Sequence, residues 1–320
     1  MIVDRADPEG AIAAAAVACS NWGRWGEDDV LGTVNYLDEA KRREAAALVR
    51  QGVSFSLSQR FEMGGPQKGW RRRTNPVHTM LDTGADAVLG HQGFPHGFGG
   101  ADDVIAMPLQ CSTQWDGLGH IFDHGKAWNG RAAEQVVTSD GDRVTGIEHM
   151  AAAVTGRGVL LDAGRHLGTD GELPDGFAIT TEHLLAVIAA EDVVVGRGDI
   201  VLVRTGQLTR ARRDGWGDYA GGAAPGLSFT TAQWLHDSEI AAIATDTWGF
   251  EVRPNEFEGA FQPLHQVAIP HIGLLIGEMW DLDALAEHCA ADGVYEFLLT
   301  AAPIPVTGAV GSPVNPIAVK

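Results

Sequence analysis

The stretch Gln110-Cys-Ser-Thr-Gln-Trp-Asp-Gly-Leu-Gly-His120 combines acidic, amide and imidazole side chains with apolar neighbours. Asp116 and His120 stand four residues apart, so a helical turn would place both on one face. Gln114 and Gln110 precede them and can offer amide oxygens to a cation. An Asp–His pair at this spacing is most often a surface hydrogen bond. Here the apolar neighbours predict burial, and buried charges need partners.

A second group of polar residues surrounds the apolar stretch from Val267 to Gly277. His265 precedes the stretch, His271 lies inside it and Glu278 ends it. A carboxylate at the end of an apolar run is costly unless it meets a cation or a hydrogen-bond donor. A single histidine in an apolar segment is more often structural, and this is the interpretation we favour for His271.

Helical and strand-like segments alternate along the chain, which predicts an α/β fold with a mixed sheet and flanking helices. We expect one domain over residues 1–320, a length that large single α/β domains reach. The predicted helices are Ala11–Cys19, Asp38–Gln51, Thr180 or Thr181 to Ala190, Thr230 or Thr231 to Glu239, and Asp281–Ala291. The predicted strands are Val53–Ser58, Val104–Leu109, Gly158–Asp162, Ile200–Arg204, Ile240–Ala244 and Val294–Ala302.

Two further segments raise functional questions. Gly84–Gly100 is rich in glycine and aromatic residues, and we weigh a substrate lid and a disordered connector equally. Asp246 and Glu251 flank Trp248 after a predicted strand, where sites of α/β proteins often form. For these two acids we favour a structural role.

The composition excludes several classes of partner. The net charge is −19, and the only basic run, Arg71 to Arg73, is too short for a nucleic-acid footprint. The apolar run Ala11–Cys19 follows acidic residues and is too short for a signal peptide or a membrane span. Three cysteines without a CxxC spacing fit a reducing compartment. We therefore expect a cytoplasmic protein that binds neither nucleic acid nor membranes.

The residues quoted so far resemble the cyclase-like metal-hydrolase family, which includes bacterial kynurenine formamidase and isatin hydrolase. The family motif is H-x-G-T-H-x-D-x-P-x-H, and Thr113, Asp116 and His120 match it in register. Glutamine replaces the two leading histidines, at Gln110 and Gln114.

The resemblance extends over nearly the whole chain. The C-terminal signature reads His265, then Gly273-Leu-Leu-Ile-Gly-Glu278-Met-Trp-Asp-Leu-Asp283. Further matching segments are Trp22-Gly, Asp28–Asn35, Trp128-Asn-Gly130, Asp199–Gly206, Gly293–Phe297, Ala302–Pro305 and Gly311–Pro316. The resemblance implies the cyclase-like, swivelling β/β/α fold.

The resemblance also implies roles for individual residues. Asp116, His265 and Glu278 would be the retained metal ligands, and His120 would move the proton. Gln110 and Gln114 would occupy the positions of the missing ligands. Because amide oxygens are weak neutral ligands, we expect one divalent ion, Mn²⁺ or Zn²⁺, rather than two. One imidazole and two carboxylates leave open positions for water.

The implied reaction is hydrolysis of an amide, cyclic imide or lactone in a small, aromatic substrate, by a homodimer or homotetramer. Two alternatives stay open. One is a ligand-binding relative without metal, which the glutamines would explain. The other is a metal-dependent lyase or isomerase that uses the same residues to move a proton.

Overall fold

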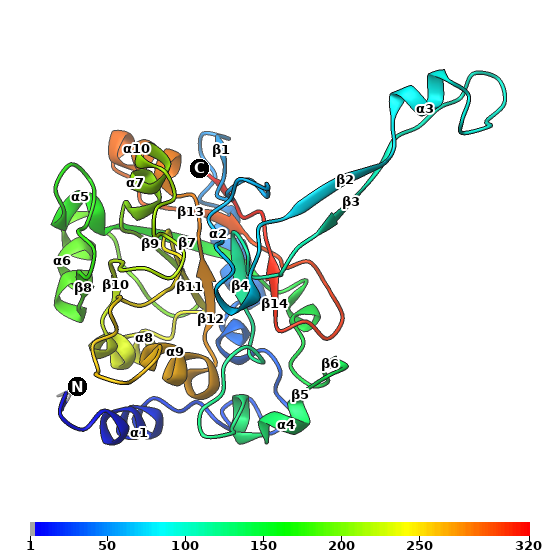
Figure 1. The fold of residues 1–320 in the computed structure, drawn as a ribbon. Coiled ribbons are helices and arrows are strands. Elements are labelled where there is room, and N and C mark those ends of the chain that lie inside the picture. The colour runs from blue at the N-terminus through cyan, green and yellow to red at the C-terminus, as the bar shows by residue number, and fades with distance from the viewer. Residues whose placement is uncertain (1–3) are drawn as a thin grey trace.

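A computed structural model describes residues 4–320, and a nine-stranded mixed sheet forms its centre (Figure 1). The strands follow the order β1-β15-β13-β7-β9-β11-β12-β4-β14. The four central strands β7, β9, β11 and β12 are parallel, and every outer pair is antiparallel. Their bounds are β1 Ser54–Ser56, β4 Gln114–Asp116, β7 Thr155–Asp162, β9 Ile200–Arg204, β11 Ala242–Thr245, β12 Leu275–Glu278, β13 Glu296–Thr300, β14 Gly311–Pro313 and β15 Ile317–Val319.

Both faces of the sheet are covered by apolar cores. Successive residues of β9 belong alternately to the two cores, with Ile200 and Leu202 in one and Val201 and Val203 in the other. This alternation is what a strand buried on both faces requires. One core contains residues of α10, and the other contains residues of α1, α6, α8 and α9. The α/β expectation is therefore confirmed.

The helices are short and lie at the surface of the sheet (Figure 1). Within residues 4–320, none is long and apolar enough to cross a membrane. Their bounds are α1 Pro8–Ala18, α2 Glu39–Ala46, α3 Gly84–Val88, α4 Ala133–Val136, α5 Ala163–Leu167, α6 Thr181–Ala190, α7 Gln207–Asp214, α8 Ala232–Asp237, α9 Pro263–Val267 and α10 Asp283–Asp292. Two small two-stranded sheets pair β5 Val137–Thr138 with β6 Gly141–Asp142 and β8 Ala178–Ile179 with β10 Gly226–Leu227.

Most of the predicted helices and strands are present, but they begin or end at other residues than predicted. Thr180 caps α6 by accepting the backbone N–H of His183, as the pattern predicts. Helix α2 starts after Asp38 as predicted but ends at Ala46, before the predicted end at Gln51. The predicted strand Val104–Leu109 is present with shifted bounds as β3, Asp102–Ala106, and it pairs with β2, Val77–Asp82, outside the central sheet.

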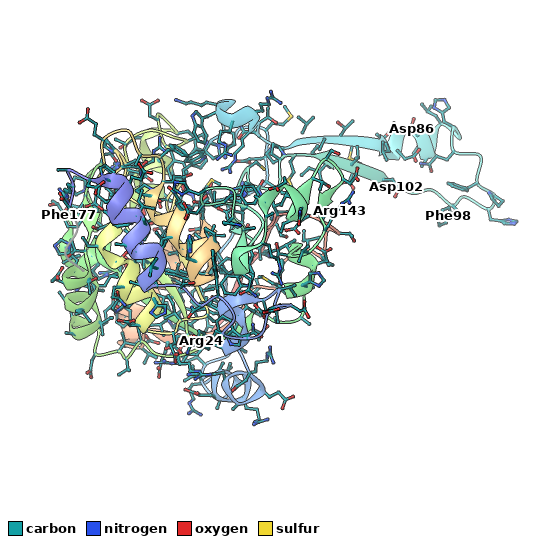
Figure 2. All side chains as sticks on the ribbon, turned by 90° about the horizontal axis from the view of Figure 1, so that it is seen from below. Arg24, Asp86, Phe98, Asp102, Arg143 and Phe177 are labelled. Atoms are coloured by element: carbon teal, nitrogen blue, oxygen red, sulfur yellow. The ribbon has the colours of Figure 1, made fainter. Side chains whose placement is uncertain are left out.

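Strands β2 and β3 form an arm that extends away from the rest of the chain (Figure 1). Figure 2 shows Asp86, Phe98 and Asp102 on this arm, far from the body. The segment Gly84–Gly100 is the tip of the arm and includes the short helix α3. It therefore covers no site in its own chain, and it carries regular structure. Neither the lid nor the disordered connector describes it.

Candidate metal centre and active site

The acid of the opening motif lies on a strand. Residues Gln114–Asp116 form β4 because both neighbours, β12 and β14, bond to this segment. The expected helical turn at Asp116 is thus wrong. In the β4–β12 register, Gln114 stands opposite Glu278 and Asp116 stands opposite Ile276. Since alternate strand residues share a face, the side chains of Gln114, Asp116 and Glu278 meet.

His265 completes this group from α9. Its Nε2 lies 3.1 Å from Oε1 of Glu278, and Asp116, His265 and Glu278 each offer a ligand atom within 4.8 Å of the others. All three residues are buried. The structure thus brings together the three residues expected as principal ligands, from β4, α9 and β12.

Glu251 orients the imidazole of His265. The Nδ1–H group of His265 donates to Oε1 of Glu251 at 2.6 Å, and the backbone N–H donates to the same oxygen at 2.9 Å. Oε2 accepts the backbone N–H of Leu264 at 3.1 Å. With Nδ1 held, Nε2 faces Glu278 and Asp116. A carboxylate behind a histidine ligand is a common arrangement in metal sites.

Glu251 therefore does more than the structural role that we favoured, because it orients a candidate metal ligand. An acid after a strand end was the available signal, but nothing in the sequence connects it to a histidine fourteen residues later. Asp246 does have the structural role we expected. It accepts the backbone N–H groups of Thr205 and Gly206 and the hydroxyl of Thr205.

Burial changes the protonation of the group. Burial raises the pKa of Asp116, opposed by the charge of His120, and the nearby Glu278 raises it further. Burial alone would lower the pKa of His265, but hydrogen bonds to Glu251 and Glu278 outweigh it and raise that pKa to about 10. The pocket therefore requires a positive charge between its carboxylates, from a proton or from a cation.

The donor set fits a divalent cation. Two buried carboxylates and one oriented imidazole are ligands that Zn²⁺ and Mn²⁺ both accept. Gln114 Nε2 donates to Glu278 Oε2 at 3.0 Å and to Asp116 Oδ1 at 3.3 Å. Its own Oε1 is buried and has no hydrogen-bond partner within residues 4–320. Rotation of the amide would exchange this oxygen with Nε2, which contacts Asp116 and Glu278, and a bound cation would then give the oxygen a partner.

The other predicted ligand, Gln110, lies apart from this group. Its amide packs against Gly311 of β14, and its buried Nε2 has no hydrogen-bond partner among the described residues. It does not line the cavity that contains Asp116 and His120.

His120 lies at the edge of the carboxylate group. After β4 the chain turns, and the N–H of His120 donates to the carbonyl of Gly117 at 3.0 Å. The turn brings Nε2 of His120 to 3.7 Å from Oδ1 of Asp116. Burial lowers the pKa of His120, which favours the neutral imidazole. A neutral imidazole beside the ligands can accept a proton.

A narrow pocket connects these residues. Its floor contains Asp116, His120, His265 and Glu278, and its other walls are Trp70, Arg71, Arg73, Trp248 and Gln262. The segment Gly69–Arg73, which we call the roof turn, is closed by hydrogen bonds between Arg72 N and Gly69 O and between Arg73 N and Trp70 O, both 3.0 Å. Cover over this site thus comes from the roof turn rather than from Gly84–Gly100.

His271, for which we favoured a structural role, lies elsewhere. Its Nε2 contacts Asp123 Oδ2 at 2.8 Å, and its ring stacks on Trp22.

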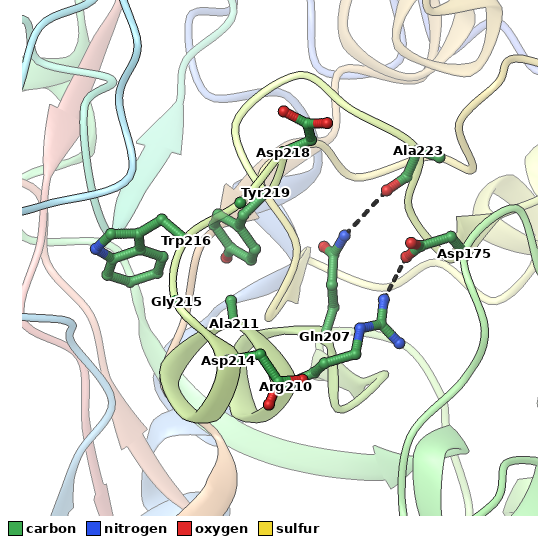
Figure 3. A pocket seen from close by; sticks show the side chains of 11 residues that line it. Asp175, Gln207, Arg210, Ala211, Asp214, Gly215, Trp216, Asp218, Tyr219 and Ala223 are labelled. Atoms are coloured by element: carbon green, nitrogen blue, oxygen red, sulfur yellow. Dashed lines mark hydrogen bonds and ion pairs between the residues drawn. The ribbon is translucent and has the colours of Figure 1, made fainter.

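A separate cavity of about 640 Å³ lies along α7 (Figure 3). There Gln207 donates to the carbonyl of Ala223, and Arg210 pairs with Asp175. None of the residues expected to take part in catalysis or metal binding lines this second cavity.

Comparison with known proteins identifies the family. A family model described as "Putative cyclase" matches residues 44–252. The chain belongs to this cyclase family. A crystal structure described as a novel cyclase is 38% identical, covers 95% of this chain and 99% of its own, and has a TM-score of 0.87. The resemblance seen in the sequence is thereby confirmed.

More distant solved structures share the fold. Isatin hydrolase A from Labrenzia aggregata, bound to benzyl benzoate, is 18% identical, with coverage of 86% of this chain and 94% of its own and a TM-score of 0.58. A predicted metal-dependent hydrolase from Bacillus stearothermophilus is also 18% identical, with coverage of 84% and 98% and a TM-score of 0.51. No curated protein matches the chain.

Proposed function

We propose that this cyclase-family protein is a metal-dependent hydrolase that opens an amide, cyclic imide or lactone bond of a small aromatic substrate. The observation that carries the proposal is the buried group Asp116, His265 and Glu278, with ligand atoms within 4.8 Å of one another. Hydrolases among the distant structural relatives support the same reaction class.

The donor set indicates one ion per chain. Asp116, His265 and Glu278 would hold Mn²⁺ or Zn²⁺, which when bound lowers the pKa of water toward neutrality and polarises a carbonyl. Glu251 holds Nδ1 of His265, which would leave Nε2 free to bind the ion. Gln114 would contribute at most a weak amide ligand, and Gln110 lies apart from the proposed ligands.

His120 is the proposed acid–base. Its Nε2 accepts a proton from the attacking water and returns it to the leaving nitrogen or oxygen of the substrate. This requires a neutral imidazole at the start, which its burial favours. Positioned proton transfer contributes about 10²–10⁴-fold to rate. Trp70 and Trp248 supply apolar walls on which a flat substrate can lie.

The test combines metal content with turnover. We expect purified full-length protein to contain close to one Mn²⁺ or Zn²⁺ per chain by plasma mass spectrometry. We expect it to open the ring of isatin, the substrate class named for its distant relatives, or of a related lactam or lactone. In H₂¹⁸O the product acid should gain one labelled oxygen. A product without label would contradict hydrolysis and favour a lyase or isomerase.

One observation favours a second candidate, a ligand-binding protein without metal. The amide of Gln114 already donates to both Asp116 and Glu278, and His265 contacts Glu278, so these polar groups can satisfy one another. Metal content below about a tenth of an ion per chain after growth with added Mn²⁺ and Zn²⁺ would support this candidate.

We also propose that the chain forms a homodimer or homotetramer through its arm. A two-stranded hairpin is marginally stable alone, yet the arm exposes large apolar side chains on both strands and at its tip: Val77, Met80, Leu81, Val88, Leu89, Phe94, Phe98, Val104 and Ile105. Light scattering should give a monomer when residues 77–106 are replaced by a short Gly-Ser turn. An unchanged mass would contradict a role for the arm.

The state of the cysteines supports a cytoplasmic location. Cys19, Cys111 and Cys289 are all unpaired and buried. Burial raises the pKa of the Cys111 thiol to about 11, so this residue beside the site is a poor nucleophile.

A further inference from the structure

The roof of the cavity is cationic, whereas its floor is acidic. Arg71 and Arg73 both line the cavity above Asp116 and Glu278. The guanidinium of Arg73 lies 5.5 Å from the ring centre of Trp248, and that of Arg71 lies 5.7 Å from Trp70. In a chain with a net charge of −19, two cations at one small cavity require an explanation.

These arginines are not the partners of the acids below them. Within residues 4–320, neither Arg71 nor Arg73 forms an ion pair with a carboxylate. The polar contact of the Arg73 side chain is with His120, at 3.5 Å between Nη2 and Nε2. Arginine usually binds carboxylates with two parallel hydrogen bonds, and that capacity is unused here.

A third guanidinium stands beside the same aromatic rings. Arg253 lies 6.0 Å from the ring centre of Trp70 and 5.8 Å from that of Trp248. It donates to the carbonyls of Gly221 and Gly222, and its Nη1 is buried without a partner among the described residues. Cation–π contacts place its charge near the cavity without neutralising it.

Arg73 is only partly exposed and lines the cavity, whereas Arg71 lines it but is exposed to solvent. Resting on the proposed function, a divalent ion would neutralise Asp116 and Glu278. Glu251, engaged by His265, would then be the single carboxylate of the site opposite three guanidinium groups. A cavity with excess positive charge around it attracts anions.

The backbone of the roof turn is shaped to present these side chains. Arg71 and Arg72 have φ of 49° and 65°, in the left-handed region that favours glycine. Such conformations are unfavourable for residues with a side chain and gather at functional sites. On either side, Gln67 donates to the carbonyl of Cys111, and Asn75 donates to the carbonyl of Gly65. The turn is thus held over the floor in a strained form.

We propose that the roof turn selects a substrate with a carboxylate on a planar ring, and that Arg73 is the residue that recognises this carboxylate. The ring would lie against Trp70 and Trp248, and the carboxylate would take the unused hydrogen bonds of Arg73. Binding would draw Arg73 away from Nε2 of His120, which frees that nitrogen to accept a proton.

The experiment measures binding rather than turnover. Benzoate is the anionic probe and benzamide is its neutral match, each titrated by calorimetry into the full-length protein as purified. We expect benzoate to bind at least tenfold more tightly than benzamide. Arg73→Ala should weaken benzoate binding about 10- to 100-fold, as loss of a charge-assisted bidentate pair predicts, and should change benzamide binding less than twofold.

Arg72→Ala is the matched control. It removes the same charge from the same turn, but Arg72 does not line the cavity. We expect it to change benzoate binding less than twofold. Equal losses for Arg72→Ala and Arg73→Ala would overturn the proposal, because a general charge effect would explain both. An unchanged benzoate affinity in Arg73→Ala would overturn it as well, since the carboxylate would then bind elsewhere.

A second variant keeps the proposal testable if Arg73→Ala fails to fold. Arg73→Lys keeps the charge but lacks the planar fork, so benzoate binding should fall between wild type and Arg73→Ala. These measurements distinguish a failure of the carboxylate proposal from a failure of the proposed hydrolase function. Hydrolysis of isatin with equal affinity for the two probes would reject only the carboxylate selection. Arg73-dependent benzoate binding without metal or turnover would reject only the hydrolase.

Discussion

Replacing Glu251 by glutamine tests how the metal centre is built. The carboxylate of Glu251 receives four N–H groups. Oε1 accepts the Nδ1 and backbone N–H of His265, and Oε2 accepts the backbone N–H of Leu264 and the side-chain amide of Asn255 at 3.5 Å. Glutamine has one acceptor oxygen, so Glu251→Gln would point an amide N–H₂ at one of these donors. The substitution also removes the charge that makes the imidazole a stronger ligand.

The expected loss follows from these contacts. A hydrogen bond to a charged group contributes roughly 1.5–3 kcal/mol, and each 1.4 kcal/mol is about tenfold in affinity. Loss of the charge on the His265 contact should therefore weaken metal binding about 10- to 100-fold, the range seen when such supporting carboxylates are removed. Turnover at saturating metal should fall less, because Asp116, His265 and Glu278 all remain.

The assay is a competition titration of Zn²⁺ and Mn²⁺ between the protein and a coloured chelator. Glu256→Gln is the control, since Glu256 lies in the same region and accepts the N–H of Phe229 at 2.6 Å but does not contact His265. Circular dichroism would establish that both variants are folded. Metal affinity of Glu251→Gln within twofold of wild type would refute the role assigned to Glu251.

Three further predictions address the remaining parts of the site and the buried charges. Asp116→Ala should lose both the ion and activity, and a fully metallated, active variant would contradict its role as a ligand. His120→Asn should keep its ion by plasma mass spectrometry and lose about 10²–10⁴-fold in kcat; stoichiometric loss of metal would instead make His120 a ligand. Burial raises the pKa of Glu191 to about 8, so this carboxyl favours the folded state below its unfolded pKa near 4.5, and that contribution disappears as pH rises through 8. Glu191→Gln should therefore raise Tm relative to wild type more at pH 9 than at pH 5 in calorimetric scans, and an equal shift at both would contradict this ionisation.

Local signals in the sequence predicted much of the fold. The run Ile200–Val203 is apolar throughout, and only a strand covered on both faces buries every one of these residues. Thr180 marks the start of α6 because its hydroxyl satisfies a free backbone N–H. Acids in apolar segments drew attention to Asp116 and Glu278, because buried acids need cationic partners. The resemblance to the family then implied Asp116, His265 and Glu278 as the ligand set.

Other features depended on contacts between distant segments. Gln114–Asp116 forms a strand because β12 and β14 supply its hydrogen bonds. A segment of three residues is too short for its hydrophobic pattern to predict a strand. The predicted strand Val104–Leu109 paired instead with β2, and the result is an arm. The pairing of strands depends on their register across the whole sheet. The spacing of apolar residues within one segment therefore cannot predict which strand it pairs with.

The sequence by itself determined the α/β class, the family and the three principal candidate ligands, because hydrophobic periodicity, capping and motif order are local properties. Only the tertiary structure shows that Glu251 contacts His265, that Gln110 lies apart from the ligands and that Arg73 contacts His120. Those relations depend on angles and distances of a few ångströms between segments far apart in the chain. Charge interactions vary strongly with such distances and with burial, and neither quantity is defined until the chain has packed.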